Sequence, residues 1–181
     1  MSQHHRLALA RGDVLADVMK YRRLVGRLVY LTITRPNLVY VVHTLSQFVN
    51  EPRKEHWEAA LRVVRYIKMN LSKGIIMKND ADLQIKGYCD SDYASCPLTR
   101  KSLSGYFVSL GESPVSWKAK KQATVAKSMA EAEYRVMAGA TSELIWLKAF
   151  LTSLGVFHSK PMHLYCDNQA ALHIAKKPGV S

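Results

Sequence analysis

The chain has 181 residues, 48% of them hydrophobic, and its 26 lysines and arginines against 14 aspartates and glutamates give a net charge of +12. The hydrophobic fraction is ordinary for a globular protein, and no stretch approaches the roughly 18 apolar residues that span a bilayer. The N-terminus lacks the apolar segment of a signal peptide. Positive charge spread along the chain favours a polyanionic partner, although a basic surface without such a partner carries the same charge.

The cysteines give little sign of a metal or disulfide framework. The chain contains three, Cys89, Cys96 and Cys166, and they follow no zinc-finger spacing. His163 and Cys166 form an isolated H-x-x-C pattern, which is weak evidence for a metal site. We therefore expect reduced thiols in a reducing compartment.

Three helices are predicted in the first part of the chain. Apolar residues recur at helical spacing from about Asp17 to Ile33. Pro36 and Pro52 each suit the first turn of a further helix, and the helix from Pro52 extends to about Met69. The polar segment 79–82 then predicts a turn and a boundary between two modules.

The second part of the chain predicts an α/β fold. Apolar residues alternate with period two over 83–90, and 103–110 and 114–117 have the pattern of the next two strands. A capping box at 128–131 begins a helix that ends near Leu154. A fourth strand over 161–167 and a short helix over 168–177 complete the order β-β-β-α-β-α. Hairpin strands followed by a helical crossover predict a mixed sheet.

The tripeptide Tyr-Cys-Asp occurs at 88–90 and again at 165–167, each time closing a predicted strand. Asp90 and Asp167 therefore both lie at strand ends. Aspartate is also common there for turn formation alone, so neither residue by itself identifies a site.

Glutamates in the long predicted helix differ in the face they occupy. Glu133 shares a stripe with apolar residues that must pack on the sheet, whereas Glu131 lies on a more polar side and suits a capping role. A buried, unpaired carboxylate is costly, so an inward Glu133 requires a cation or a proton. The alternative is a partly exposed glutamate at the edge of the stripe. Together with Asp90 and Asp167, an inward Glu133 predicts a Mg²⁺ site suited to phosphodiester chemistry.

Two groups of basic residues are candidates for contact with a phosphate backbone. Lys118, Lys120 and Lys121 fall in a segment predicted to join a strand to the long helix, and Arg100 and Lys101 form a second group. The alternative is that these are solvated loop charges.

Segments spread over nearly the whole chain carry a specific pattern. In the second part they are GYCDSDYA at 87–94, TRKSLSGY at 99–106, SWKAKKQ at 116–122, AEAEY at 130–134, ELIWL at 143–147 and YCDNQAA at 165–171. In the first part they are YRRLVG at 21–26, LTITRP at 31–36 and EHWEAA at 55–60. These segments resemble the ribonuclease H domain of copia-type LTR retrotransposon Pol polyproteins and the C-terminal part of the linked reverse transcriptase.

The resemblance implies a ribonuclease H-like fold over 83–181, preceded over 1–78 by a helical, connection-like C-terminal segment of the reverse transcriptase. It implies hydrolysis of RNA in RNA–DNA hybrids with two Mg²⁺ ions, for which Mn²⁺ can substitute. The family's first three acidic ligands fall on Asp90, Glu133 and Asp167. Its fourth is an aspartate in a later segment, and the sequence ends at Ser181. We therefore expect an incomplete domain that lacks the last strand and helix.

The partners implied are an RNA–DNA hybrid or other nucleic acid and the remainder of the reverse transcriptase, with no membrane. The implied location is intracellular, in a cytoplasmic particle or the nucleus. Two alternatives remain open at this point. Without the fourth carboxylate, the chain can be a catalytically inactive, domesticated or decayed nucleic-acid-binding relic. The helical first part also fits a structural subunit that supports a polymerase.

Overall fold

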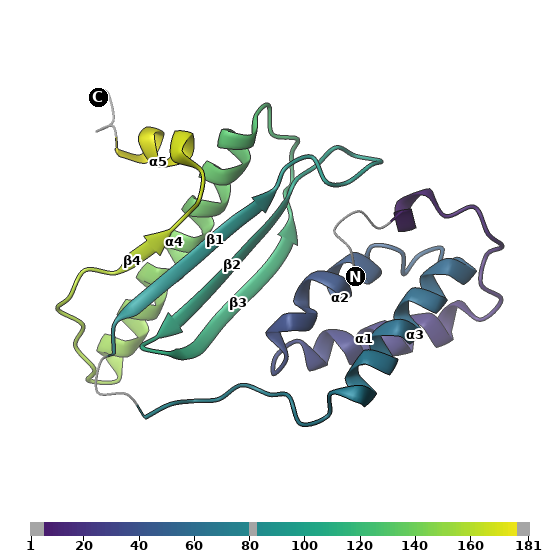
Figure 1. Ribbon diagram of the computed structural model, residues 1–181, viewed down its shortest axis with the longest axis horizontal. Helices are drawn as coiled ribbons and strands as arrows, with labels where there is room; N and C mark the ends of the chain where they lie inside the picture. The colour runs from purple at the N-terminus through teal and green to yellow at the C-terminus, as the bar shows by residue number, and fades with distance from the viewer. Residues whose placement is uncertain (1–5, 80–82, 177–181) are drawn as a thin grey trace. The chain divides into compact units, whose positions relative to one another are not determined.

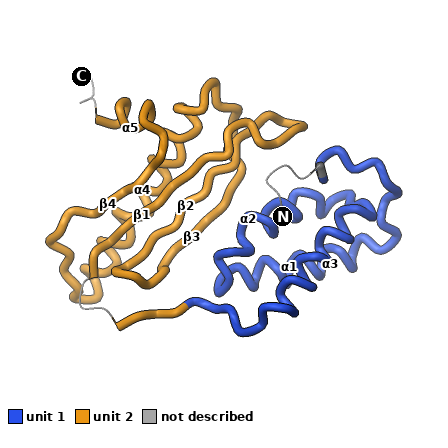
Figure 2. The backbone as a smooth tube through the Cα atoms, in the orientation of Figure 1, with its two compact units in different colours: residues 1–75 blue, residues 76–181 orange. Residues whose placement is uncertain are grey.

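The computed structural model describes residues 6–79 and 83–176, and the chain divides into two compact units, residues 1–75 and 76–181 (Figures 1 and 2). Most of the predicted boundary turn, residues 80–82, lies outside the described residues. Each unit has hydrophobic clusters of its own. Each is therefore described by itself.

The first unit is helical, as predicted. Its α-helices are α1 (Val18–Leu31), α2 (Val39–Ser46) and α3 (Lys54–Met69), with short 3₁₀ helices at Arg6–Leu9 and Pro36–Leu38. Their apolar faces meet in one cluster, whose least exposed members include Tyr21, Leu45 and Ala60. Burial of these faces against one another stabilises helices of this length more than their intrinsic propensity does.

Tyr21 ties α1 to α2 by a buried hydrogen bond. Its hydroxyl donates to the carbonyl oxygen of Leu45 at 2.8 Å, and the side chain has no exposed surface. The Leu45 carbonyl also accepts from the Phe48 amide at 3.1 Å, so it keeps one partner when the hydroxyl is removed. Burial raises the pKa of Tyr21, so the donor stays protonated.

We expect Tyr21→Phe to destabilise the first unit by about 1 kcal/mol, the usual contribution of one buried hydrogen bond. Tyr30→Phe provides the control, because Tyr30 is on the same helix but 79% exposed. Hydrogen exchange of the α1 and α3 amides measures the effect. Equal exchange rates in the two variants would contradict the assigned role of the hydroxyl.

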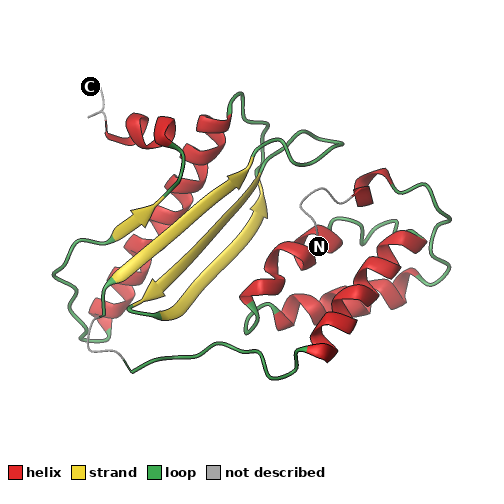
Figure 3. Cartoon of the chain, viewed as in Figure 1, coloured by secondary structure: helices red, strands yellow, loops and turns green. Residues whose placement is uncertain are grey.

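The second unit contains a four-stranded mixed sheet in the order β3-β2-β1-β4 (Figure 3). The strands β1 (Ile85–Asp92), β2 (Leu103–Leu110) and β3 (Ser113–Lys121) form an antiparallel meander. After the crossover helix α4 (Met129–Ser153), β4 (His163–Tyr165) pairs parallel to β1, and α5 (Gln169–Lys176) follows. The mixed α/β sheet is confirmed, and its strand order is compatible with a ribonuclease H-like fold.

Helix α4 packs on the sheet along the predicted apolar stripe. Val136, Ala140 and Leu144 are buried on it. The Ser128 hydroxyl accepts from the Glu131 amide at 3.1 Å and caps the helix, and Gly155 follows its end with φ of 80°. The capping role of Glu131 is confirmed, since its Oε2 accepts from the Lys127 amide at 2.7 Å.

Three of the four strands differ from their predicted bounds. β1 spans Ile85–Asp92 and not 83–90, so Asp90 lies within the strand and not at its end. β3 continues to Lys121 because it pairs with β2 as far as Leu103, so the segment 118–121 is strand and not a connecting loop. β4 is shorter than predicted and ends at Tyr165. Beyond it the chain turns into α5, where the Asn168 side chain accepts from the Ala171 amide at 2.9 Å. The predicted last residue of that helix lies outside the described residues.

Candidate metal centre

The two Tyr-Cys-Asp tripeptides lie side by side, because β1 and β4 pair in the register Tyr88 to Tyr165. The two tyrosine rings stack with centroids 5.0 Å apart. Side chains alternate along a strand, so Cys89 points to the opposite face, where it is 7% exposed in the α4 cluster. The parallel pairing therefore brings the cysteines and the aspartates of both copies to the same edge of the sheet, near the C-terminal ends of β1 and β4.

Glu133 reaches this edge from the first turns of α4 and is 3% exposed. Its Oε1 accepts from the Ser91 amide at 2.9 Å, and its Oε2 accepts from the Cys166 thiol at 3.6 Å. The predicted inward orientation is confirmed, and the alternative of a partly exposed glutamate is wrong. Two hydrogen bonds hold the carboxylate in place before any ligand binds.

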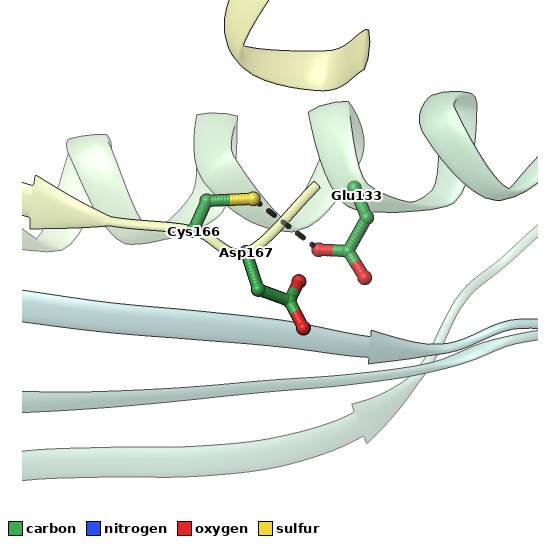
Figure 4. A group of neighbouring side chains, drawn as sticks. All are labelled: Glu133, Cys166 and Asp167. Atoms are coloured by element: carbon green, nitrogen blue, oxygen red, sulfur yellow. Dashed lines mark hydrogen bonds between the residues drawn. The ribbon is translucent and has the colours of Figure 1, made fainter. Parts of the chain in front are cut away.

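Figure 4 shows Glu133, Cys166 and Asp167 gathered together, with one ligand atom from each within 4.8 Å of the others. Among the described residues, this is the group with the spacing of a metal site. Asp90 is exposed on β1 and is not a member of the group. Its charge nevertheless acts on Glu133. The structure thus brings the three predicted acids into one neighbourhood, with Asp90 at its margin.

The electrostatics of this neighbourhood favour a cation. Burial raises the pKa of Glu133, and the charges of Asp90 and Asp167 raise it further, against the lowering effect of the Ser91 hydrogen bond. A buried carboxylate that faces two other negative charges gains most from a bound proton or metal ion. A Mg²⁺ ion with carboxylate ligands fits this donor set.

Comparison with known proteins identifies the family. The chain is 42% identical to the Retrovirus-related Pol polyprotein from transposon RE2 of Arabidopsis thaliana and 40% identical to that from transposon RE1, in each case over 98% of the chain. It is 38% identical, over 86% of the chain, to the corresponding polyprotein from transposon TNT 1-94 of Nicotiana tabacum. The chain belongs to the Pol polyproteins of copia-type transposons.

This Pol polyprotein chain spans about an eighth of the length of those relatives, since it covers 12% of each. No family model and no solved structure matches it. None of the helices in its described residues has the length and hydrophobicity that a bilayer span requires.

Sequence reasoning missed the two thiols near this metal centre. The Cys166 thiol donates to Glu133, and the Cys89 thiol donates to the Tyr165 carbonyl oxygen at 3.6 Å. Burial raises the pKa of Cys89 to about 12 and also raises that of Cys166. The isolated H-x-x-C pattern pointed elsewhere, because Nδ1 of His163 faces the Tyr165 hydroxyl at 3.4 Å. The available signal was the repeated tripeptide, because the β1–β4 pairing that aligns its two tyrosines also brings the two cysteines into one part of the sheet.

The predicted basic residues of the Pol chain separate into two sets. Lys121 Nζ lies 3.1 Å from Cys96 Sγ, and the Cys96 amide donates to the Lys101 carbonyl. Lys121, Lys101 and Arg100 therefore lie together at the loop between β1 and β2. Lys118 and Lys120 are exposed on the face of β3 that α4 covers, because Lys118 pairs with Tyr106, which hydrogen-bonds to Glu143 of α4.

Proposed function

We propose that the second unit hydrolyses the RNA strand of RNA–DNA hybrids, with two Mg²⁺ ions as cofactors and Mn²⁺ as a substitute. The observation that carries the proposal is the group of Glu133 on α4 and Asp167 after β4, with the charge of Asp90 on β1 acting on Glu133 from the margin of the group. We also propose that the first unit is the C-terminal segment of the reverse transcriptase, and that the remainder of that enzyme is its partner.

Each carboxylate has a distinct part in this proposal. Glu133 is fixed by the Ser91 amide and supplies a ligand oxygen whose position is set in advance. Asp90 and Asp167 are exposed, and their oxygens would hold the Mg²⁺ ions together with Glu133. When bound, two such ions activate a water molecule and stabilise the leaving oxygen. The chain's own contribution is to hold three acids where these ions are required.

The net charge of +12 supports a nucleic acid as substrate. Arg100, Lys101 and Lys121 form the basic group proposed to contact one phosphate backbone. Lys118 and Lys120 lie on the other face of the sheet and are proposed to contact a more distant part of the duplex. The affinity for a hybrid should therefore fall steeply with salt, as it does whenever lysines and arginines displace counterions.

Cleavage of an end-labelled RNA–DNA hybrid tests the proposal. We expect RNA cleavage with Mg²⁺ or Mn²⁺, none with EDTA, and none by an Asp90→Asn variant whose circular dichroism is unchanged. Cleavage that survives this substitution would refute the site. Salt-sensitive hybrid binding without any cleavage would instead support the catalytically inactive nucleic-acid-binding alternative.

A further inference from the structure

Among the described residues of the second unit, one face of the sheet has no helix packed on it (Figure 3). Helices α4 and α5 share a hydrophobic cluster with Cys89 of β1, so both lie on the opposite face. Side chains alternate along a strand, and the neighbours of Cys89 therefore point away from that cluster. These neighbours are Tyr88 and Asp90, and both are exposed.

An aromatic row crosses this uncovered face from one edge of the sheet to the other. Residues that pair in register share a face of a sheet. The three strand registers align one aromatic residue from each strand: Trp117, Phe107, Tyr88 and Tyr165. Tyr88 and Tyr165 are 45% and 47% exposed, and their rings stack. Because β4 is an edge strand, Tyr165 ends the row, and a further planar ring can extend the stack from that end.

Polar and charged side chains border the row on both sides. Lys86 and His163 pair in register two positions before the tyrosines of the row, on the same face. Asp90 and Asp167 each follow a tyrosine of the row by two positions. Two positions along a strand span about 6.6 Å. The row thus lies between a lysine–histidine pair and two acids of the candidate metal centre.

We propose that this face binds an unpaired strand of nucleic acid, with bases stacked on the tyrosine end of the row and a phosphate beside Lys86 and His163. Aromatic side chains on the open face of a four-stranded sheet form a platform on which unpaired bases stack. Such stacking accepts any base, because every base has a π-face. The net charge of +12 adds a general attraction for the phosphates.

The charges around the row favour a nucleic acid over an apolar protein segment. A helix packed over the row would bury the charges of Lys86 and Asp90, which is costly. A nucleotide instead covers the rings with its base and brings a phosphate to Lys86. The bases of the proposed hybrid substrate are paired with one another, so a surface for unpaired bases goes beyond the proposed function.

Binding of labelled DNA strands to the full chain, measured by fluorescence anisotropy, tests the inference. The probes are an oligothymidylate of about 12 nucleotides and an abasic strand with the same number of phosphates. Hydrolysis of RNA cannot consume a DNA probe, so the result does not depend on the proposed function. We expect the oligothymidylate to bind at least about 10-fold more tightly than the abasic strand. Equal affinity for the two strands would overturn the inference.

Tyr165→Leu keeps an apolar side chain at the end of the row but removes the ring. It should weaken oligothymidylate binding about 10-fold and leave binding of the abasic strand unchanged. Tyr134→Leu is the matched control, because Tyr134 is 44% exposed but lies on α4, and it should affect neither strand. Lys86→Gln should weaken both strands alike, since it acts on phosphates. Equal losses of oligothymidylate binding in Tyr165→Leu and Tyr134→Leu would contradict the assigned surface.

Photo-crosslinking of the wild-type chain provides a measurement that needs no variant, and circular dichroism verifies that Tyr165→Leu folds. The probe is the same strand with 5-iodouracil in place of thymine, which cross-links on irradiation to aromatic rings in contact with it. We expect the cross-linked peptides to contain Tyr88 or Tyr165. Cross-linking that misses both tyrosines would overturn the inference.

Discussion

Replacing Glu133 by glutamine should weaken Mg²⁺ binding and hybrid cleavage by at least about 100-fold and, without metal, make the second unit more stable. Glutamine keeps an oxygen that can accept from the Ser91 amide, so the shape of the site is preserved. It removes the negative charge that attracts the cation. The same charge is buried against Asp90 and Asp167 in the free protein, and this is why the two effects have opposite signs.

The stability gain should depend on pH in a defined direction. Because burial and the neighbouring charges raise the pKa of Glu133, the native state holds this proton more tightly than the unfolded chain does. The unfolding free energy of the wild type therefore falls as pH rises from the ordinary value of 4.5 through the raised value. At pH values above the raised pKa, the buried negative charge of Glu133 destabilises the wild type in full. The glutamine variant lacks this charge and is not destabilised.

Thermal unfolding in EDTA at about pH 7.5 and at about pH 4 measures this difference. We expect Glu133→Gln to unfold at a higher temperature than the wild type only at the higher pH. Glu131→Gln is the matched control two residues away. Its carboxylate accepts from the Lys127 amide and pairs with Arg135, which lower its pKa, so its removal should reduce stability at neutral pH. A Glu133→Gln variant that is less stable than the wild type at pH 7.5 would contradict this account.

Gly87→Val should destabilise the second unit by about 3 kcal/mol, although valine is favoured in strands. A Cβ at Gly87 would lie 3.2 Å from two methyl carbons of Leu144 and one of Leu164. Leu144 is 3% exposed within the core, so it cannot move aside without repacking the helix against the sheet. The glycine thus permits the close approach of α4 to β1.

Gly105→Val on the neighbouring strand is the control for this substitution. A Cβ there meets only backbone oxygens at 3.8 and 3.9 Å, which is ordinary contact. We expect no loss of stability, and a small gain because glycine is unfavourable in a strand. Urea denaturation followed by circular dichroism measures both variants. An equal loss for the two would show that strand geometry, and not packing against Leu144, determines the cost.

The sequence predicted the parts of this fold that follow from local periodicity. The stripe through Glu133 identified the inward glutamate, because a helix fixes which residues share a face. The predicted end of β3 was wrong, because pairing with β2 extends the strand through Lys118 and Lys120. A strand segment of alternating small and charged residues has no apolar pattern that would predict it. The two thiols were missed for a related reason. Cys89 and Cys166 are far apart in the chain, and their shared place in the α4 cluster depends on the β1–β4 register, which periodicity does not specify.

The same long separation affects the order in which the molecule assembles. Strands β1, β2 and β3 are joined by short connections, whereas Cys89 and Tyr165, which contact across β1 and β4, are 76 positions apart. Closing so long a loop costs more entropy than forming a hairpin, and only three residue pairs between β1 and β4 offset this cost. We expect the amides of β4 to exchange with solvent faster than those of β2. The meander can thus fold early around α4 with Asp90 and Glu133 in place, and we expect Cys166 and Asp167 to join them in the last folding step and to leave them in the first unfolding step.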